Sequence, residues 1–261
     1  MTPAVTYNVG GGNYLVAWED NRHGQWEIYA QLWNCAKQSV NAAVRITTNA
    51  SHQLSPDVAC GKSPTGCWVV WEDFRNGQWE IYGQRLTVAG ALAGGNVRLT
   101  NNASIQRYPT ITRNPEDTGC ALESFMVAWQ DSRNSANTGT DIYIQQLDNL
   151  GALCGGNMAV TTNKGNQMYP DLAYGTTNNA YQVTWQDHRN GNADIYARRV
   201  NPAGAGIGGD FWLSNLAPSN QSRPAVCYGS TPNRFNSVWY DMRAGNLDVY
   251  GQRSGGAGGL V

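Results

Sequence analysis

Hydrophobic and polar positions alternate along this chain in short runs that recur at a regular interval. In the second repeat these runs are Pro56–Cys60, Cys67–Asp73, Trp79–Leu86 and Asn96–Asn102. The first three are rich in β-branched and aromatic residues, and glycine, proline, asparagine or serine separates one run from the next. No segment shows a sustained helical period. The pattern predicts four strands per repeat and almost no helix.

One motif marks every repeat: Trp-x-Asp-x-Arg, a short polar turn, then an acid, a branched aliphatic residue and a tyrosine. Successive motif tryptophans are 53, 58, 56 and 54 positions apart; they are Trp18, Trp71, Trp129, Trp185 and Trp239. Units of this length cannot bury their apolar faces alone and therefore stack against one another. Four strands in each of five units predict an all-β, five-bladed β-propeller with three to four antiparallel strands per blade. The alternative is an open β-solenoid, whose repeats are usually shorter.

We expect a single domain over residues 1–261, with blades at 3–49, 56–102, 109–163, 170–215 and 224–261. In the second, third and fourth units a Gly-Gly pair leads into the fourth strand, whereas the fifth unit ends in GGAGGLV. The last blade is therefore expected to be incomplete. Either residues 259–261 close it as a very short strand, or the chain is an excised piece of something longer.

The charged residues of the motif form a trio in every unit, because an acid returns on the strand after the turn. An arginine held between two carboxylates makes several charge-assisted hydrogen bonds. Five equivalent copies favour structural ion pairs over a reaction centre, although each trio could also hold a cation or a sugar hydroxyl. The trios are Asp20, Arg22 and Glu27; Asp73, Arg75 and Glu80; Asp131, Arg133 and Asp141; Asp187, Arg189 and Asp194; and Asp241, Arg243 and Asp248.

The run Asp-x-Arg-x-Gly followed by (Asp/Glu)-Ile-Tyr-x-Gln-Arg and Arg-Leu-Thr-Asn-Asn resembles tandem repeats of secreted and cell-surface bacterial and archaeal proteins. It is more distantly similar to the TolB-type propeller repeat, although the Ser-Pro-Asp-Gly turn of that repeat is missing: Ser55–Asp57 is not followed by glycine until Gly61. The resemblance extends over all five units. It implies an extracellular propeller, a class whose functions are mostly binding or display.

Composition limits the partners. The net charge of −1 argues against nucleic acid or an anionic membrane surface, and no apolar run is long enough to span a bilayer. Six cysteines in a secreted β domain suggest disulfides. Cys60 and Cys67 bracket a turn and are candidates for a hairpin bridge; Cys120 and Cys154 belong to the third unit; a Cys35–Cys227 bridge would join the first and last blades. No metal-ligand spacing is visible, and no cofactor is expected.

Glycoside hydrolysis needs two opposed carboxylates at one place in the molecule. Outside the motif and its neighbours Glu19 and Glu72, Asp57 and Asp171 follow a strand-initiating proline and could face the central channel, which makes them candidate ligand-binding residues. The remaining acids are expected to be loop charges: Glu116, Asp117, Glu123, Asp148 and Asp210. Because these carboxylates are repeated or scattered, the sequence predicts no catalytic residue.

Binding is therefore the predicted function. Trp26 and Trp79 are candidates for stacking on sugar rings, but they share strand parity with Ile28 and Ile81, which favours burial between blades. We expect a non-catalytic extracellular module that binds a glycan or another protein, or that self-associates through the incomplete fifth blade. The alternative is a propeller enzyme of the glycoside hydrolase type that acts on polysaccharide.

Overall fold

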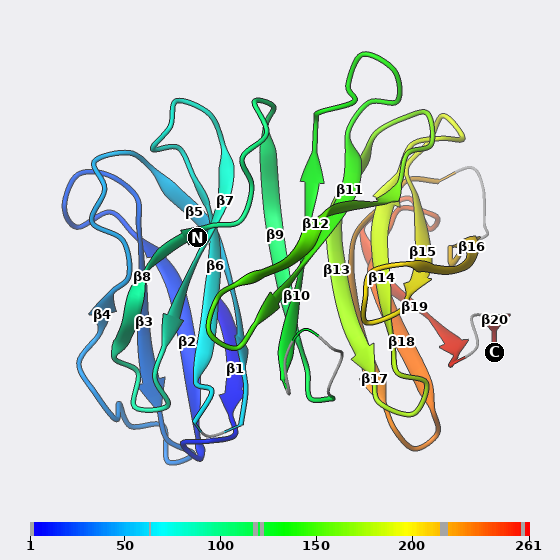
Figure 1. Cartoon of the computed structure of the whole chain (residues 1–261). Coiled ribbons are helices and arrows are strands. Elements are labelled where there is room, and N and C mark those ends of the chain that lie inside the picture. The colour runs from blue at the N-terminus through cyan, green and yellow to red at the C-terminus, as the bar shows by residue number, and fades with distance from the viewer. Residues whose placement is uncertain (1–2, 63, 117–119, 121–122, 215–218, 257–258) are drawn as a thin grey trace. The chain divides into compact units, whose positions relative to one another are not determined.

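The fold is the predicted five-bladed β-propeller. The computed structural model describes residues 3–62, 64–116, 120, 123–214, 219–256 and 259–261 of the chain. Within these residues the regular secondary structure consists of strands alone, arranged as five four-stranded sheets (Figure 1). In every sheet the strands lie side by side in chain order, which is the order that short antiparallel connections produce.

Each sheet corresponds to one sequence repeat. The first contains β1 (Ala4–Asn8), β2 (Asn13–Asp20), β3 (Glu27–Trp33) and β4 (Val44–Arg45). The second contains β5 (Gln53–Cys60), β6 (Cys67–Asp73), β7 (Glu80–Leu86) and β8 (Leu92–Arg98). The third contains β9 (Gln106–Asn114), β10 (Ser124–Asp131), β11 (Asp141–Asp148) and β12 (Leu153–Thr161). The fourth contains β13 (Gln167–Gly175), β14 (Ala180–Asp187), β15 (Asp194–Val200) and β16 (Gly206–Trp212). The fifth contains β17 (Gln221–Gly229), β18 (Arg234–Asp241), β19 (Asp248–Gly255) and β20 (Gly259–Leu260).

The fifth blade has a fourth strand, but a very short one. Strand β20 pairs with β19 through Ser254↔Leu260 and Gly255↔Gly259. The very short strand expected from residue 259 is therefore present. The expected boundary of the fourth blade at residue 215 lies outside the described residues.

Residue contacts divide the chain into two compact units. Unit 1 comprises residues 1–127 and 146–156, and unit 2 comprises 128–145 and 157–261. In unit 1 the apolar core lies where the first two sheets pack together, and it includes Leu15, Ile28, Val69, Trp71 and Leu86. In unit 2 a smaller cluster joins Ile195 and Ala197 of β15 to Leu213 and Trp239. Each unit thus contains its own buried apolar contacts.

The motif forms a tight hairpin between the second and third strands of its blade. Every residue of β6 is buried, as expected for a strand covered on both faces. Asp73 pairs with Glu80 at the end of the β6–β7 ladder. Gly77 has the predicted positive φ, at 83°, and its N–H donates to the Phe74 carbonyl over 3.1 Å. The hairpin therefore presents Phe74 and Trp79 on either side of its turn.

A bulge recurs near the start of the innermost strands. Ser55, Tyr108, Tyr169 and Arg223 each precede the strand proline and have φ values of 50–54°. A residue with a side chain adopts this left-handed region only at a cost, so the surrounding contacts must hold it there. The N–H of Ser55 donates to Glu19 Oε1 over 2.6 Å, and that of Tyr108 donates to Glu72 Oε1 over 2.7 Å. The residue before the motif aspartate thus supports the bulge of the following blade.

Candidate functional site

The motif aspartate and arginine form an ion pair in all five blades. One carboxylate oxygen accepts the arginine backbone N–H over 2.8–3.0 Å, and the other accepts the motif tryptophan Nε1–H over 2.7–3.2 Å. The guanidinium lies 4.0–4.5 Å from the ring centre of the motif tyrosine. At Asp241, burial raises the pKa but the hydrogen bonds from Arg243 outweigh it, so that the pKa falls to about 2.

The third acid of each trio does not complete the expected arginine fork. Glu27 pairs with Arg45 and Glu80 with Arg98, both from the fourth strand of their own sheet. Asp141, Asp194 and Asp248 instead accept from Asn134, Asn190 and Asn246 over 2.8–3.0 Å. The prediction of one arginine between these two carboxylates is wrong because the third acid extends from the opposite strand of the hairpin to a different partner.

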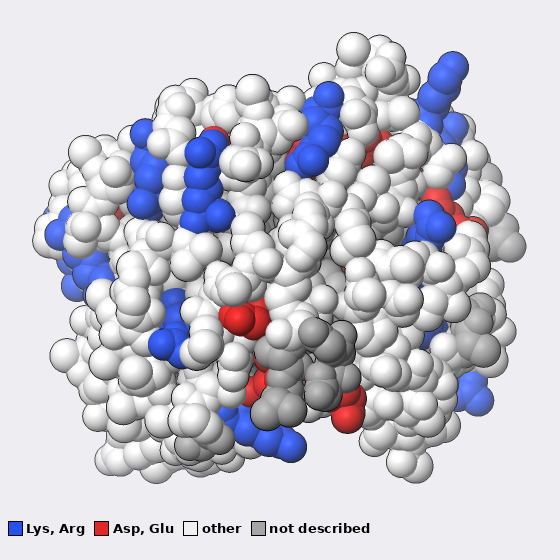
Figure 2. All heavy atoms as spheres, in the orientation of Figure 1, with Lys and Arg blue, Asp and Glu red and all other residues white. Residues whose placement is uncertain are grey.

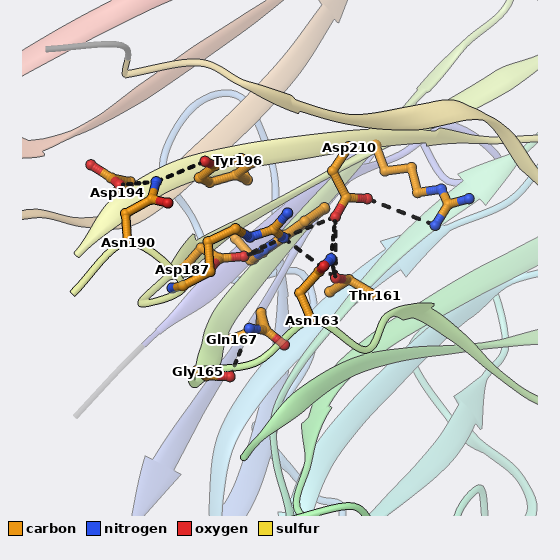
Figure 3. A network of polar contacts seen from close by, with 12 residues as sticks. Thr161, Asn163, Gly165, Gln167, Asp187, Asn190, Asp194, Tyr196 and Asp210 are labelled. Carbon is orange, nitrogen blue, oxygen red and sulfur yellow. Dashed lines mark hydrogen bonds and ion pairs between the residues drawn. The ribbon is translucent and has the colours of Figure 1, made fainter. Parts of the chain in front are cut away.

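In the fourth blade an arginine does lie between two carboxylates, but the second carboxylate comes from a residue outside the motif. Arg189 Nη2 lies 2.6 Å from Asp187 Oδ2 and 2.8 Å from Asp210 Oδ2. Asp210 also accepts from Asn163 over 2.9 Å and from Thr161 over 3.2 Å (Figure 3). Asn96 and Asn157 take the equivalent place beside the motif arginine in the second and third blades. Asp210 is therefore a strand residue in a structural network, and not a loop charge.

Other acids predicted to be loop charges also have defined structural contacts. Glu123 is 7% exposed, accepts the Lys62 N–H and pairs with Arg113. Asp148 ends β11 and accepts the N–H groups of Gly151 and Ala152 in the following turn. Asp117 lies outside the described residues.

Asp57 and Asp171 stand on the first strands of their sheets, and both reach the neighbouring blade. Asp57 Oδ2 accepts the Ile111 N–H over 2.7 Å and the Thr110 hydroxyl over 3.0 Å. Asp171 Oδ2 accepts the Val226 N–H over 2.6 Å. Both residues remain half-buried. Each carboxylate therefore stabilises a blade junction while keeping part of its surface open.

Glu72 is the acid that reasoning from the sequence missed, since it was set aside as a neighbour of the motif. It is fully buried on β6, and Oε2 accepts from Arg107 Nε and Nη2 over 2.9 and 2.8 Å. Burial raises the pKa of Glu72, and the charge of Arg107 only partly opposes this change. The Arg107 side chain that pairs with Glu72 is itself 30% exposed, so it stays accessible to solvent.

Glu72 and Asp57 form a pair that recurs in no other blade. At the position of Asp57 the other repeats have Ala4, Thr110, Asp171 and Ala225, and at the position of Glu72 they have Glu19, Gln130, Gln186 and Tyr240. Both acids of the pair reach β9 of the next blade, Glu72 at Arg107 and Tyr108 and Asp57 at Thr110 and Ile111. Comparison of the repeats could have found this pair from the sequence, had the neighbours of the motif been included.

The two candidate binding tryptophans differ in their surroundings. Both are half-buried, so the predicted burial between blades is only partial. The Trp79 ring packs on Phe74 with 5.1 Å between ring centres and has Arg107 4.9 Å from its own centre. The Trp26 backbone N–H donates to His52 Nδ1 over 3.3 Å. Only Trp79 is linked through Arg107 to Glu72.

Two disulfides are present. Cys60–Cys67 joins β5 to β6, as predicted, and Cys120–Cys154 links two segments of the third repeat. The proposed Cys35–Cys227 bridge is wrong, because both thiols are free and exposed. Within the described ranges, no three His, Cys, Asp or Glu side chains are grouped so as to hold a metal ion.

Two further observations concern the charge on the surface and the possibility of a membrane span. On the face drawn in Figure 2, uncharged residues predominate and Lys and Arg stand in separate groups. Among the described residues, no helix is long and apolar enough to cross a membrane.

Several solved structures with a similar fold are carbohydrate-active enzymes by name. An endo-arabinase from Bacteroides thetaiotaomicron is 10% identical, with a TM-score of 0.57 over 95% of this chain and 92% of that one. An alpha-L-arabinanase from Penicillium chrysogenum complexed with arabinobiose is 14% identical, with a TM-score of 0.63 over 92% and 77%. An alpha-L-arabinofuranosidase from Fusarium graminearum in complex with an iminosugar inhibitor is 14% identical, with a TM-score of 0.63 over 97% and 80%. No family model and no curated protein sequence matches the chain.

These similarities correct the functional prediction. The sequence favoured a non-catalytic binding or display module, with no enzymatic activity. The structural neighbours are arabinan- and arabinoside-cleaving enzymes by name, and they agree with the alternative of a glycoside hydrolase-type propeller. The prediction of a non-catalytic module was therefore wrong; it rested on the repetition of the motif acids and set aside the acids beside the motif.

Proposed function

We propose that this protein is a glycoside hydrolase-type enzyme that acts on a neutral polysaccharide, with Glu72 and Asp57 as its carboxyl pair. The observation that carries the proposal is that this pair occurs in one blade only and that its two acids lie in different environments. The Glu72 carboxyl is buried with a raised pKa, whereas the Asp57 carboxylate is half-buried and accepts hydrogen bonds. A buried acid with a raised pKa, together with a partly exposed carboxylate, suits the two roles in glycoside cleavage.

In this reaction Glu72 gives its proton to the glycosidic oxygen as the bond to the anomeric carbon breaks. Asp57 takes a proton from the attacking water, whose oxygen bonds to the anomeric carbon. Solvent then returns both carboxyl groups to their starting states. Displacement of the partly exposed Arg107 side chain by substrate would open the buried Glu72 carboxyl to the sugar. Arabinans are the first substrates to test, because the structural neighbours are named for cleaving them.

The test is hydrolysis of arabinan and of other neutral polysaccharides by the parent chain, measured as release of reducing ends. We expect Glu72→Gln and Asp57→Asn each to lower kcat by at least about 100-fold, as loss of a general acid or base does. Glu19→Gln is the matched control. Glu19 of the first blade bonds the Ser55 N–H as Glu72 of the second blade bonds the Tyr108 N–H, but the residue at the Asp57 position of the first blade is Ala4. Equal turnover in all four chains, or none in the parent on any substrate, would contradict the proposal.

We further propose that the chain self-associates through the exposed face of the fifth blade that carries Tyr240 and Val249. The apolar residue after the third acid is 0% exposed in four blades, at Ile28, Ile81, Ile142 and Ile195, whereas Val249 is 68% exposed. Tyr240 on the adjacent strand is 46% exposed. Strand β19 is paired with β20 through only two residue pairs. An exposed apolar sheet face and a strand with few pairing partners both favour association with another sheet. Its partner in this proposal is a second copy of the chain.

An extracellular location is proposed as well. Its support is the pair of disulfides, because such bonds persist in oxidising compartments.

A further inference from the structure

Three side chains at the junction between the second sheet and β9 form a group that none of the other repeats has. They are Phe74 and Trp79, on either side of the β6–β7 turn, and Arg107 near the start of β9. At the position of Phe74 the other repeats have Asn21, Ser132, His188 and Met242. At that of Trp79 they have Trp26, Thr140, Ala193 and Leu247, and at that of Arg107 they have Leu54, Met168 and Ser222. Because four blades fold without this group, the scaffold does not require it.

The rings and the guanidinium lie in contact. Phe74, which is 38% exposed, packs against Trp79 with an angle of 56° between the rings. The Arg107 Cζ lies 4.9 Å from the centre of the Trp79 ring and 5.0 Å from that of Tyr108. Cation–π contacts of this kind hold the guanidinium between the two rings. The group is therefore a set of partly exposed aromatic faces built around one cation.

We propose that Phe74, Trp79, Tyr108 and Arg107 form a subsite for a neutral sugar ring, named here the aromatic subsite. The inference rests on the proposed function for its substrate class. The apolar face of a sugar stacks on an aromatic ring, while its hydroxyls accept hydrogen bonds from a nearby donor. Arg107 supplies N–H donors at the edge of the rings.

The hydrogen bonds of Arg107 limit what the aromatic subsite offers to a sugar. Arg107 donates from both Nε and Nη2 to Glu72 Oε2, so only its remaining N–H groups are left for a ligand. Sugar hydroxyls can accept hydrogen bonds from these groups without bringing a charge, which suits a neutral sugar. The link through Arg107 also places the subsite directly beside Glu72. A sugar bound there would contact the residue that covers the proposed acid.

The test measures binding separately from turnover. In an Asp57→Asn chain, which cannot turn over substrate under the proposed function, titration calorimetry with arabinobiose and longer arabino-oligosaccharides gives the Kd. We expect Trp79→Ala to weaken binding at least tenfold and Phe74→Ala to weaken it by a smaller factor, while Trp79→Phe restores part of the affinity. Trp26→Ala is the matched control, because Trp26 occupies the same position in the first blade beside Asn21 and Leu54. We expect it to bind as tightly as the Asp57→Asn background.

The outcomes separate the two proposals. Loss of binding in Trp79→Ala alone, in a protein that shows no turnover, would support the subsite and reject hydrolysis. Turnover by the parent with no effect of Trp79→Ala on Kd would reject the subsite and keep hydrolysis. Equal weakening by Trp79→Ala and Trp26→Ala would also reject the subsite, as would failure of every neutral oligosaccharide to bind. The fluorescence melting temperature of each variant identifies any that has not folded.

Discussion

At the scale of single residues, Glu72 couples the stability of the fold to pH. Because burial raises its pKa above the ordinary value of 4.5, the folded chain holds this proton more tightly than the unfolded chain does. The stabilisation from Glu72 is therefore complete below pH 4.5 and is lost as the pH rises through the folded-state pKa. The amide introduced by Glu72→Gln cannot ionise. As the pH rises from about 4 to 7, the free energy of unfolding of this variant should therefore increase relative to that of the parent. Urea denaturation at both pH values measures this difference. A constant difference would show that Arg107 cancels the effect of burial, and a change in favour of the parent would show that Arg107 outweighs it; either result would contradict the prediction.

At the scale of strands and sheets, single carboxylates join neighbouring blades through backbone N–H groups. Asp171 of β13 bonds Val226 of β17 in this way. We expect Asp171→Ala to lower the free energy of unfolding by about 1–3 kcal/mol, because it leaves a partly buried donor without this acceptor. Asp171→Asn keeps an oxygen at the same place and should cost about half as much or less. Thermal and denaturant unfolding compare the two variants. Equal stability of Asp171→Ala and the parent would mean that the bond contributes nothing to the junction.

At the scale of the whole molecule, the exposed face of the fifth blade predicts association between copies. The molar mass from light scattering should rise with protein concentration for the parent, and Val249→Lys should remain monomeric because it places a charge on the apolar face. Leu150→Lys is the control, since Leu150 is 70% exposed in the β11–β12 turn and does not belong to the fifth blade. A parent that is monomeric at every concentration, or one whose association is lost equally in both variants, would count against self-association.

The sequence alone determined the repeat, the strands and the fold class. The alternation in β6, the glycine at the Gly77 turn and the recurring motif are local features, and local backbone preferences translate them directly into hairpins and sheets. The Cys60–Cys67 bridge was predictable for the same reason, because both cysteines belong to one hairpin. The motif ion pairs likewise join residues two positions apart.

Only the tertiary structure decided the surroundings of each acid. The pKa of Glu72 depends on burial by the next blade and on Arg107, which is 35 positions away in the chain. The third acids of the trios bond to residues of the fourth strand or of the turn. The second carboxylate beside Arg189 is that of Asp210. Trp79 and Trp26 share a sequence position, yet only Trp79 meets an arginine from the following blade. Contacts across a blade junction depend on the side chains of two repeats at once, so the pattern within one repeat could not specify them.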